Sequence, residues 1–574
     1  MKLTDYVAEF LSRQGIKYVF GLTGGAAVHL FDSLDKNKKI TPIYNHHEQA
    51  AALAAEAYAR TTNNLGAAIV TTGPGGVNAI TGLVAAWLDS IPCIFISGQT
   101  RKEHSSHNKK IRQLGSQEFD ILSLVKPVSK YAVMIDDPKM IKYHLQKAVY
   151  VARSGRPGPV WIDLPLNLQW SEIMPERLKS FKPPAAQQSS GPKIKKCFKL
   201  LKQARRPLVL AGHGIRLSHA EKEFKKFIKK SRIPFVSSWN AADLFPEGRE
   251  YNLGVPGIFG QRGANLAVQN CDLLISIGSH LAIPLTGIQY ASFARGAKIV
   301  MVDIDPVELA FKTVRVDLSI CADAGQFLCR VQQKAHVNNV WQERCAKYQA
   351  YNVMPAQWKK QKKYVNPYVL VDFLYHKLGK DDQVVVDGGG TINQIAFQAF
   401  TGQKIGRIII SAGICSMGTG LPESIGACFA RGRKRTICLC GDGSMQLNIQ
   451  ELQTIAQHRL PVIIFVFNNS GYLAIRNTQD GFLKSNYTGS AAGGGLRLPD
   501  FKKVAKAYGI ESVQIKNHKE LAKKVKNVLS KTGPVVCEIM VSPKQEIIPR
   551  TGFNRPLEDM YPYLSRKEVE VQNG

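Results

Sequence analysis

The chain has 574 residues, of which 44% are hydrophobic and 21% charged. These proportions are usual for a soluble globular protein, and the length predicts about three or four domains. The formal net charge is +32, but the lysines are scattered as pairs without a nucleic-acid-binding motif, so solvated helix faces explain the charge better than binding to nucleic acid.

Residues 1–170 are predicted to form a doubly wound parallel sheet, because helical and strand patterns alternate along them. The expected strands are Val19–Phe20, Ile40–Tyr44, Ala67–Thr71 and Cys93–Ser97, and the expected helices include Ala26–Leu34 and Glu48–Arg60. Glu48 therefore lies at a helix start, where the helix dipole stabilises a carboxylate, and this structural role alone would account for it.

The middle of the chain is predicted to hold a linker at 171–192, a central Rossmann-like α/β domain at 193–335 and a second, helical and basic linker at 336–365. Strands are expected at Pro207–Ala211, Pro234–Ser237, Asp272–Ile277 and Lys298–Asp303. Gly212 and Gly214 form only a Gly-x-Gly pattern, which is too little to indicate a dinucleotide site.

Residues 366–549 are predicted to form a third α/β domain, followed by a tail at 550–574. Its most informative stretch runs from Thr436 to Gly471, where two apolar strands, Thr436–Cys440 and Val462–Phe467, flank a helix expected at Gln446–His458. Since ligands of open α/β sheets bind at the carboxyl ends of the strands, we expect a site there.

The residue types at these two strand ends suit a diphosphate and a magnesium ion. Gly441 and Gly443 let the backbone approach a bulky anion, and the amides from Ser444 onward open a helix, whose N-terminus favours phosphate. Asp442 and Asn469 offer oxygen ligands to Mg²⁺, and a turn carbonyl near Gly471 could add a third. The structural alternative is an ordinary strand–turn–helix with a surface aspartate.

This block resembles the signature of thiamine diphosphate (ThDP) enzymes, a GDG sequence followed by an Asn-Asn pair, and the resemblance to acetolactate synthases covers nearly the whole chain. Further matching stretches are Phe20–Gly25, His47–Ala51, Thr72–Gly76, Gly155–Val160, Ser416–Pro422 and Pro556–Met560. The resemblance implies three doubly wound α/β domains and the cofactors ThDP and Mg²⁺. In chain order, the first domain would bind the pyrimidine, the second would be the central domain, and the third would bind the diphosphate.

The resemblance also implies roles for single residues. Glu48 would hydrogen-bond the aminopyrimidine and shuttle its proton, a role that suits a carboxyl partly removed from water. Gly390 and Thr391, in the glycine turn after strand Val384–Val386, would hold the diphosphate from the other side. Met417 would be the apolar wedge that bends the cofactor, although a core methionine would have the same side chain. The glycine- and serine-rich stretch Gly481–Gly495 has the composition of a solvated surface loop, but we expect a mobile lid that orders over the cofactor. The resemblance implies that the tail packs near that site.

Some positions depart from the family pattern. Acetolactate synthases usually carry an arginine where His280 and Pro284 stand, and the loss of both argues against the FAD that the central domain of that family binds. Simple 2-oxo acid decarboxylases carry proton donors at the positions of Gly25 and Ile475, and neither residue here can donate a proton.

The implied reaction is decarboxylation of a 2-oxo acid, pyruvate first of all, with transfer of the two-carbon unit to a second carbonyl. Gln117 matches a substrate-pocket residue and Gly25 lies in the same pocket, whereas a phenylalanine and a tryptophan of the family are replaced by Ser116 and Thr478. A roomier pocket keeps open a keto-sugar or another acceptor, and a simple decarboxylase or a ThDP-binding protein without turnover are further alternatives.

Partners and location follow from the same observations. Glu48 and Asp442 belong to separate sheets, so we expect a homodimer or homotetramer that unites them across an interface. The eleven cysteines form no metal-binding spacing and indicate free thiols in a reducing compartment. Without a signal-peptide pattern or an uncharged run of the ~20 residues that a membrane span needs, the protein is expected to be cytoplasmic and not membrane-bound.

Overall fold

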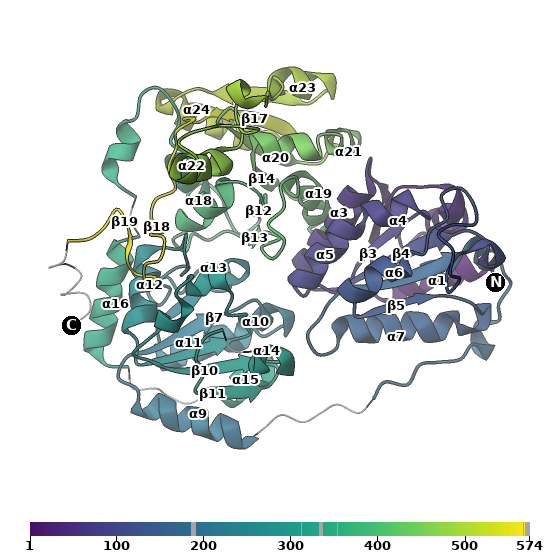
Figure 1. Ribbon diagram of the computed structural model, residues 1–574, viewed down its shortest axis with the longest axis horizontal. Coiled ribbons are helices and arrows are strands. Elements are labelled where there is room, and N and C mark those ends of the chain that lie inside the picture. The colour runs from purple at the N-terminus through teal and green to yellow at the C-terminus, as the bar shows by residue number, and fades with distance from the viewer. Residues whose placement is uncertain (185–190, 312, 332–336, 353, 566–567, 569–574) are drawn as a thin grey trace.

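The computed structural model describes residues 1–184, 191–311, 313–331, 337–352, 354–565 and 568. Parts of the predicted linkers, of the central domain and of the tail, at 185–190, 312, 332–336, 353, 566–567 and 569–574, lie outside the described residues. Three parallel sheets, each covered by helices on both faces, follow one another along the chain (Figure 1), so the predicted fold class is confirmed.

The first sheet has six strands, with helices α1, α2, α7 and α8 on one face and α3 to α6 on the other. In spatial order its strands are β2 (Thr41–Tyr44), β1 (Tyr18–Gly21), β3 (Gly66–Val70), β4 (Cys93–Gln99), β6 (Val160–Pro165) and β5 (Tyr131–Met134). The helices are α1 (Leu3–Arg13), α2 (Val28–Lys36), α3 (Glu48–Thr62), α4 (Pro74–Asn78), α5 (Ile80–Leu88), α6 (Leu122–Val125), α7 (Ile141–Arg153) and α8 (Leu166–Gln169).

The central sheet has five strands in the order β11 (Leu318–Cys321), β10 (Lys298–Asp303), β9 (Leu273–Ile277), β7 (Pro207–Ala211) and β8 (Phe235–Ser237). Its helices are α9 (Gly191–Gln203), α10 (Gly214–Leu217), α11 (Glu221–Ser231), α12 (Arg262–Asn270), α13 (Ile283–Thr286), α14 (Pro306–Ala310), α15 (Ala324–Arg330) and α16 (Asn339–Ala350). Helix α16 falls in the segment predicted as a linker, yet its Trp341 and Tyr348 are buried beside α12 in the core of this unit.

The third sheet has six strands in the order β13 (Arg407–Ile409), β12 (Gln383–Val386), β14 (Thr436–Gly441), β15 (Val462–Asn468), β17 (Val535–Met540) and β16 (Glu511–Ile515). Its helices are α17 (Pro367–Tyr375), α18 (Ile392–Gln398), α19 (Gly420–Ala430), α20 (Asp442–Leu447), α21 (Glu451–Gln457), α22 (Leu473–Phe482), α23 (Phe501–Ala507) and α24 (His518–Leu529). The helix predicted at Gln446–His458 is confirmed only in part, because it is divided into the end of α20 and α21 by a turn at Asn448, whose side-chain amide donates to the Gly418 carbonyl (2.7 Å).

The first and third units share one continuous core, in which α3 packs on α19. Small residues make this crossing close: a Cβ added at Gly426 would lie 2.0 Å from the carbonyl oxygen of Ala54. The alanines of α3 therefore do more than favour helix formation, because their small side chains let α3 pack closely against α19.

The described part of the tail lies against the central unit. Strands β18 (Arg550–Thr551) and β19 (Met560–Tyr561) pair antiparallel, and Asn265 of α12 donates to the Leu557 carbonyl. Phe553 approaches Phe482, at the end of α22, with ring centroids 6.4 Å apart. The tail therefore bridges the central unit and the helix that follows the Asn-Asn turn.

All eleven cysteines are free, and only Cys321, Cys329 and Cys415 are exposed. Within the described residues no helix combines the length and the apolar character needed to cross a bilayer.

Candidate functional site

Asp442 lies at the carboxyl end of β14 and has both side-chain oxygens occupied by backbone amides. Its Oδ1 accepts from Gly443 N (2.8 Å), and its Oδ2 accepts from Asn469 N and Gly471 N (3.0 Å each). Burial raises the pKa of this carboxyl to about 6, although the three hydrogen bonds act to lower it. These bonds fix the carboxylate against the Asn-Asn turn and leave it lone pairs for a cation.

Asp387 is a second buried carboxylate, at the carboxyl end of the neighbouring strand β12. No role for its side chain was predicted from the sequence. Its two oxygens accept from Gly389 N (2.9 Å) and Gly420 N (2.8 Å). Burial raises its pKa to about 6, and hydrogen bonds, one of them from Ser444, act to lower it. An aspartate between a buried strand and three glycines was the available signal.

Met417 lies over both glycine turns. A Cβ added at Gly389 would lie 2.3 Å from Met417 Cγ, and one added at Gly443 would lie 3.1 Å from its Cε and 2.3 Å from the Tyr472 ring. The methionine is half-buried. It therefore lies between the two turns rather than in a closed core, as a wedge requires.

The remaining residues predicted for the diphosphate follow the same edge. Ser444 is buried in the first turn of α20, which begins at Asp442, directly after Gly441. Thr391 precedes α18, and Gly390 has a φ of +79° with no atom within 4 Å of an added Cβ. The turn at Gly390 therefore faces open space.

Asn469 has an additional partner that sequence reasoning did not find. The Arg476 guanidinium donates through Nη2 to the Asn469 carbonyl (2.9 Å) and to its Oδ1 (2.8 Å). Arg476 is buried and comes from α22, one turn after Gly471. The amide oxygen is held in place and keeps a second lone pair for a metal.

Glu48 begins α3, as predicted, and only 7% of it is exposed. Its Oε2 accepts from Asn78 Nδ2 (3.0 Å). Within the described parts of the chain, its Oε1 accepts no hydrogen bond and faces Gly75, where an added Cβ would lie 3.5 Å away. One oxygen is therefore positioned and the other is left for a ligand.

Gly25 and Gln117, the predicted substrate residues, lie on loops of the first unit. A Cβ at Gly25 would meet nothing within 4 Å. Gln117 has a φ of +64°, unusual for a side chain of this size, and its carbonyl oxygen would lie 2.0 Å from a Cβ on Gly73. The close approach therefore requires a glycine at position 73. The positive φ of Gln117 is a backbone strain of the kind that is concentrated at functional sites.

Hydrogen bonds within one chain join the start of α3 to the third unit. Gln49 Oε1 accepts from Asn448 Nδ2 (3.1 Å), and Glu451 accepts from Asn45 Nδ2 and from His46 N (2.9 Å each). The predicted location of Glu48 opposite the Asp442 site of a partner protomer stays a prediction, since the structure holds one chain.

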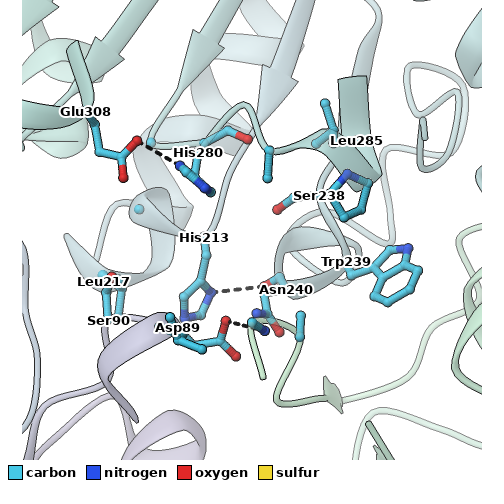
Figure 2. A pocket seen from close by; sticks show the side chains of 18 of the residues that line it. Asp89, Ser90, His213, Leu217, Ser238, Trp239, Asn240, His280, Leu285 and Glu308 are labelled. Carbon is cyan, nitrogen blue, oxygen red and sulfur yellow. Dashed lines mark hydrogen bonds and ion pairs between the residues drawn. The ribbon is translucent and has the colours of Figure 1, made fainter. Parts of the chain in front are cut away.

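A cavity of about 670 Å³ lies between the central sheet edge and the first and third units, and Figure 2 shows part of its lining. It reaches Gly390 and Cys415 of the third unit. His280, at one of the replaced arginine positions, donates through Nδ1 to the Glu308 carboxylate (2.7 Å), and Arg156 Nη1 donates to the other Glu308 oxygen (2.7 Å). Pro284 also lines the cavity, so both departures from the family pattern face it.

The donor set fits magnesium bound with a diphosphate. Among the described residues no group of three or more His, Cys, Asp or Glu side chains could hold a metal, so a cation at Asp442 needs amide, carbonyl and ligand oxygens. This is the ligand set that Mg²⁺ takes in nucleotide and diphosphate sites. Within the two glycine turns, a Cβ added at Gly390 or Gly441 would have no atom nearer than 4.0 Å, so these two positions are open to a diphosphate.

Comparison with known proteins agrees with the fold of three α/β units. Models of the thiamine pyrophosphate enzyme family match as the N-terminal TPP binding domain at 1–124, the central domain at 194–331 and the C-terminal TPP binding domain at 388–539. The chain belongs to the thiamine pyrophosphate enzyme family, which confirms the resemblance found in the sequence.

Relatives within the family align with nearly the whole chain. The acetolactate synthase large subunit of Buchnera aphidicola (subsp. Schizaphis graminum) is 30% identical over 98% of this chain and 99% of its own length. The probable acetolactate synthase large subunit of Methanocaldococcus jannaschii is 32% identical over 95% and 93%. The isozyme 3 large subunit of Escherichia coli is 30% identical over 98% of each. The protein is thus a thiamine pyrophosphate enzyme similar to acetolactate synthase large subunits.

Proposed function

We propose that this protein decarboxylates a 2-oxo acid, pyruvate first of all, with ThDP and Mg²⁺, and joins the two-carbon unit to a second carbonyl compound. The observation that carries the proposal is Asp442, buried, held by three backbone amides and adjoining two glycine turns that Met417 separates. The similarity to acetolactate synthase large subunits supports it.

In this proposal Asp442, the Asn469 side chain and the Gly471 carbonyl hold Mg²⁺, and the turns at Gly390–Thr391 and Gly441–Ser444 hold the diphosphate. ThDP held there would supply the nucleophile for the 2-oxo group and the electron sink for the loss of carbon dioxide. Glu48 holds and moves a proton at its free Oε1, while Asn78 fixes the other oxygen and so the orientation of the carboxyl.

The fate of the two-carbon unit depends on whether a proton donor is near. Gly25 has no side chain and Ile475 is a half-exposed apolar residue, so neither delivers a proton to the reacting carbon. This favours attack on a second carbonyl over release of an aldehyde.

We further propose a homodimer or homotetramer. Apolar side chains next to site residues are exposed in the single chain: Tyr44, Val77, Leu447 and Ile475 are each 38–50% exposed. Exposed apolar surface of this kind beside a cleft is typical of an interface. A second copy that covers it would place the Glu48 of one protomer at the Asp442 cleft of the other.

The first experiment tests the cofactor site by thermal unfolding. ThDP with Mg²⁺ is expected to raise the Tm of the wild-type protein and to leave that of Asp442→Ala unchanged. Asp381→Ala, an exposed aspartate of the same unit, serves as the control and should respond like the wild type. Equal shifts for the wild type and Asp442→Ala would refute the site.

The second experiment identifies the products of pyruvate turnover. Acetolactate or acetoin is expected, and acetaldehyde as the sole product would contradict the reading of Gly25 and Ile475. A second acceptor class, keto-sugars, is favoured by one observation: the 670 Å³ cavity reaches Gly390 and Ala474, and the apolar Pro284 lines it where the family has its second arginine. Turnover of pyruvate that needs an added keto-sugar would decide for that acceptor.

A further inference from the structure

A second cavity, of about 560 Å³, adjoins the segment Gly254–Gln261, other residues of which line the first cavity. The central unit, the helical segment before the third unit, and the tail each contribute to its walls, and Val255 lines both cavities. Its volume is in the range of small-molecule sites. The ThDP residues do not line it, so it is separate from the proposed cofactor cleft.

The charges that line this second cavity are unbalanced. It is lined by the cations Arg249, Arg262 and Lys359 and by one carboxylate, Asp372, which already faces His376 (3.4 Å). Among the described residues none of the three cations has an ion-pair partner within 4 Å. The cavity therefore favours an anion.

Two buried polar atoms in its lining lack partners, although their neighbours are satisfied. Gln261, Gln349 and Asn352 use their amides on backbone groups. By contrast Arg262 Nη1 and Ser237 Oγ have no hydrogen bond within the described residues, and these residues are only 7% and 1% exposed. Unsatisfied groups of this kind cost free energy unless a ligand or water completes them.

Aromatic rings form another part of the wall. Trp358 packs on Tyr368 with ring centroids 4.7 Å apart, and Tyr563 of the tail lines the cavity while half-exposed. Trp358 itself is half-buried, so it offers surface to a planar group.

We propose that this second cavity binds a nucleoside phosphate, with the base against Trp358 and the phosphate among Arg249, Arg262 and Lys359. Arg262 Nη1 and Ser237 Oγ gain partners when the ligand or its bound water enters. The ligand class rests on cations and aromatic surface together, because a cationic cavity alone would suit any anion and an aromatic one any flat molecule.

The test measures binding of ADP to the full-length protein saturated with ThDP and Mg²⁺, so that the cofactor cleft is filled. Titration calorimetry, with tryptophan fluorescence as a second readout, is expected to give one ADP per chain. Adenosine and inorganic phosphate, tested separately, are each expected to bind at least ~10-fold more weakly, because each lacks one of the two contacts.

Variants locate the binding. The double substitution Arg249→Gln/Lys359→Gln changes only exposed side chains and is expected to weaken ADP binding ~10-fold or more. The matched control is Lys360→Gln/Lys362→Gln, which removes the same charge from the adjoining exposed segment outside the cavity and should bind like the wild type. Trp358→Leu should weaken ADP but leave inorganic phosphate unaffected.

Three outcomes would overturn the proposal. ADP that fails to bind at millimolar concentration excludes a nucleoside phosphate. Equal affinity in the double variant and its control excludes the second cavity. Loss of ADP binding in His280→Leu, with retention in Arg249→Gln/Lys359→Gln, assigns the nucleotide to the first cavity instead. None of these outcomes depends on the proposed catalytic activity.

Discussion

At the scale of the residue, Asp442 combines burial with three backbone hydrogen bonds, and burial has the larger effect on its pKa. The folded pKa of about 6 lies above the ordinary value of 3.8. The neutral carboxyl is therefore favoured in the folded protein, and ionisation as the pH rises from 3.8 to about 6 lowers the stability of the metal-free fold. A bound cation would favour the carboxylate and so offset this loss of stability.

The pH dependence of magnesium binding follows from that shift. Because Mg²⁺ needs the ionised carboxyl, its affinity in the presence of ThDP should fall roughly tenfold per pH unit below about 6 and be nearly constant above pH 7. Magnesium titrations followed by protein fluorescence between pH 5 and 8 measure it. A constant affinity over that range would mean that Asp442 is ionised throughout and that burial does not raise its pKa.

At the scale of the element, the crossing of α3 and α19 depends on the absence of a side chain at Gly426. A Cβ there would lie 2.0 Å from the Ala54 carbonyl, and backbone cannot move aside as a flexible side chain can. We expect Gly426→Ala to cost about 1–3 kcal/mol by overpacking. Gly379→Ala is the control, because an added Cβ meets nothing within 4 Å there. Urea unfolding of both variants measures the difference, and equal midpoints would refute the tight crossing.

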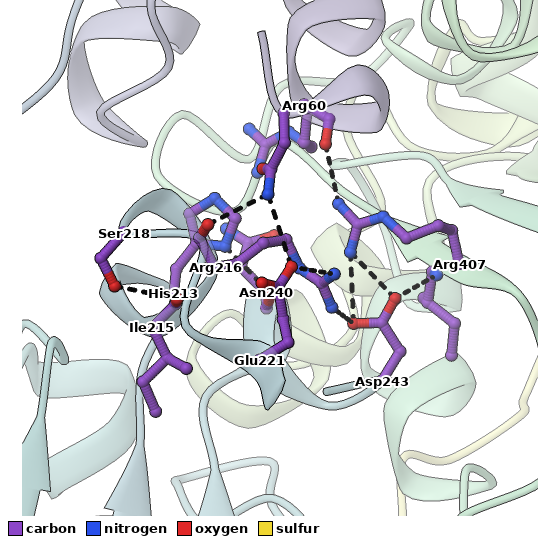
Figure 3. A network of polar contacts seen from close by, with 11 residues as sticks. Arg60, His213, Ile215, Arg216, Ser218, Glu221, Asn240, Asp243 and Arg407 are labelled. Carbon is purple, nitrogen blue, oxygen red and sulfur yellow. Dashed lines mark hydrogen bonds and ion pairs between the residues drawn. The ribbon is translucent and has the colours of Figure 1, made fainter. Parts of the chain in front are cut away.

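At the scale of the whole molecule, one buried cluster joins all three units (Figure 3). Asp243 of the central unit accepts from Arg216 Nη2 (2.6 Å) and from Arg407 Nη1 (3.0 Å) of the third unit, and Arg407 donates to the Arg60 carbonyl (2.9 Å) of the first. Removing the carboxylate would leave the buried Arg407 guanidinium without its counter-charge and Arg216 with Glu221 alone, at 3.4 Å.

Asp243→Ala is therefore expected to destabilise the protein by roughly 3–5 kcal/mol. Asp381→Ala, which removes a carboxylate from the exposed pair with Lys434, should leave the unfolding midpoint unchanged. Calorimetry distinguishes the two, and a separate low-temperature transition in Asp243→Ala would indicate that the units unfold apart. Comparable midpoints would show that the cluster contributes little.

Assembly is testable by complementation between inactive variants. Glu48→Gln and Asp442→Ala should each abolish turnover alone. If the sites lie between protomers, unfolding and refolding the two together yields mixed dimers in which one site has neither substitution, and activity returns. If each site lies within one chain, every site in the mixture carries a substitution and no activity appears.

The sequence by itself determined the parallel sheets and the positions of Asp442 and Asn469 at neighbouring strand ends, because buried apolar runs, glycine turns and the Asp442–Asn469 spacing are local patterns. It did not give the break at Asn448, the packing of α16 or the Arg476 contact with Asn469. Each depends on a partner distant in sequence or on a side chain whose role is set by its surroundings. Only the tertiary structure brought Met417 over both glycine turns and joined Asp243 to Arg407, because close packing selects among side chains that local pattern leaves equivalent.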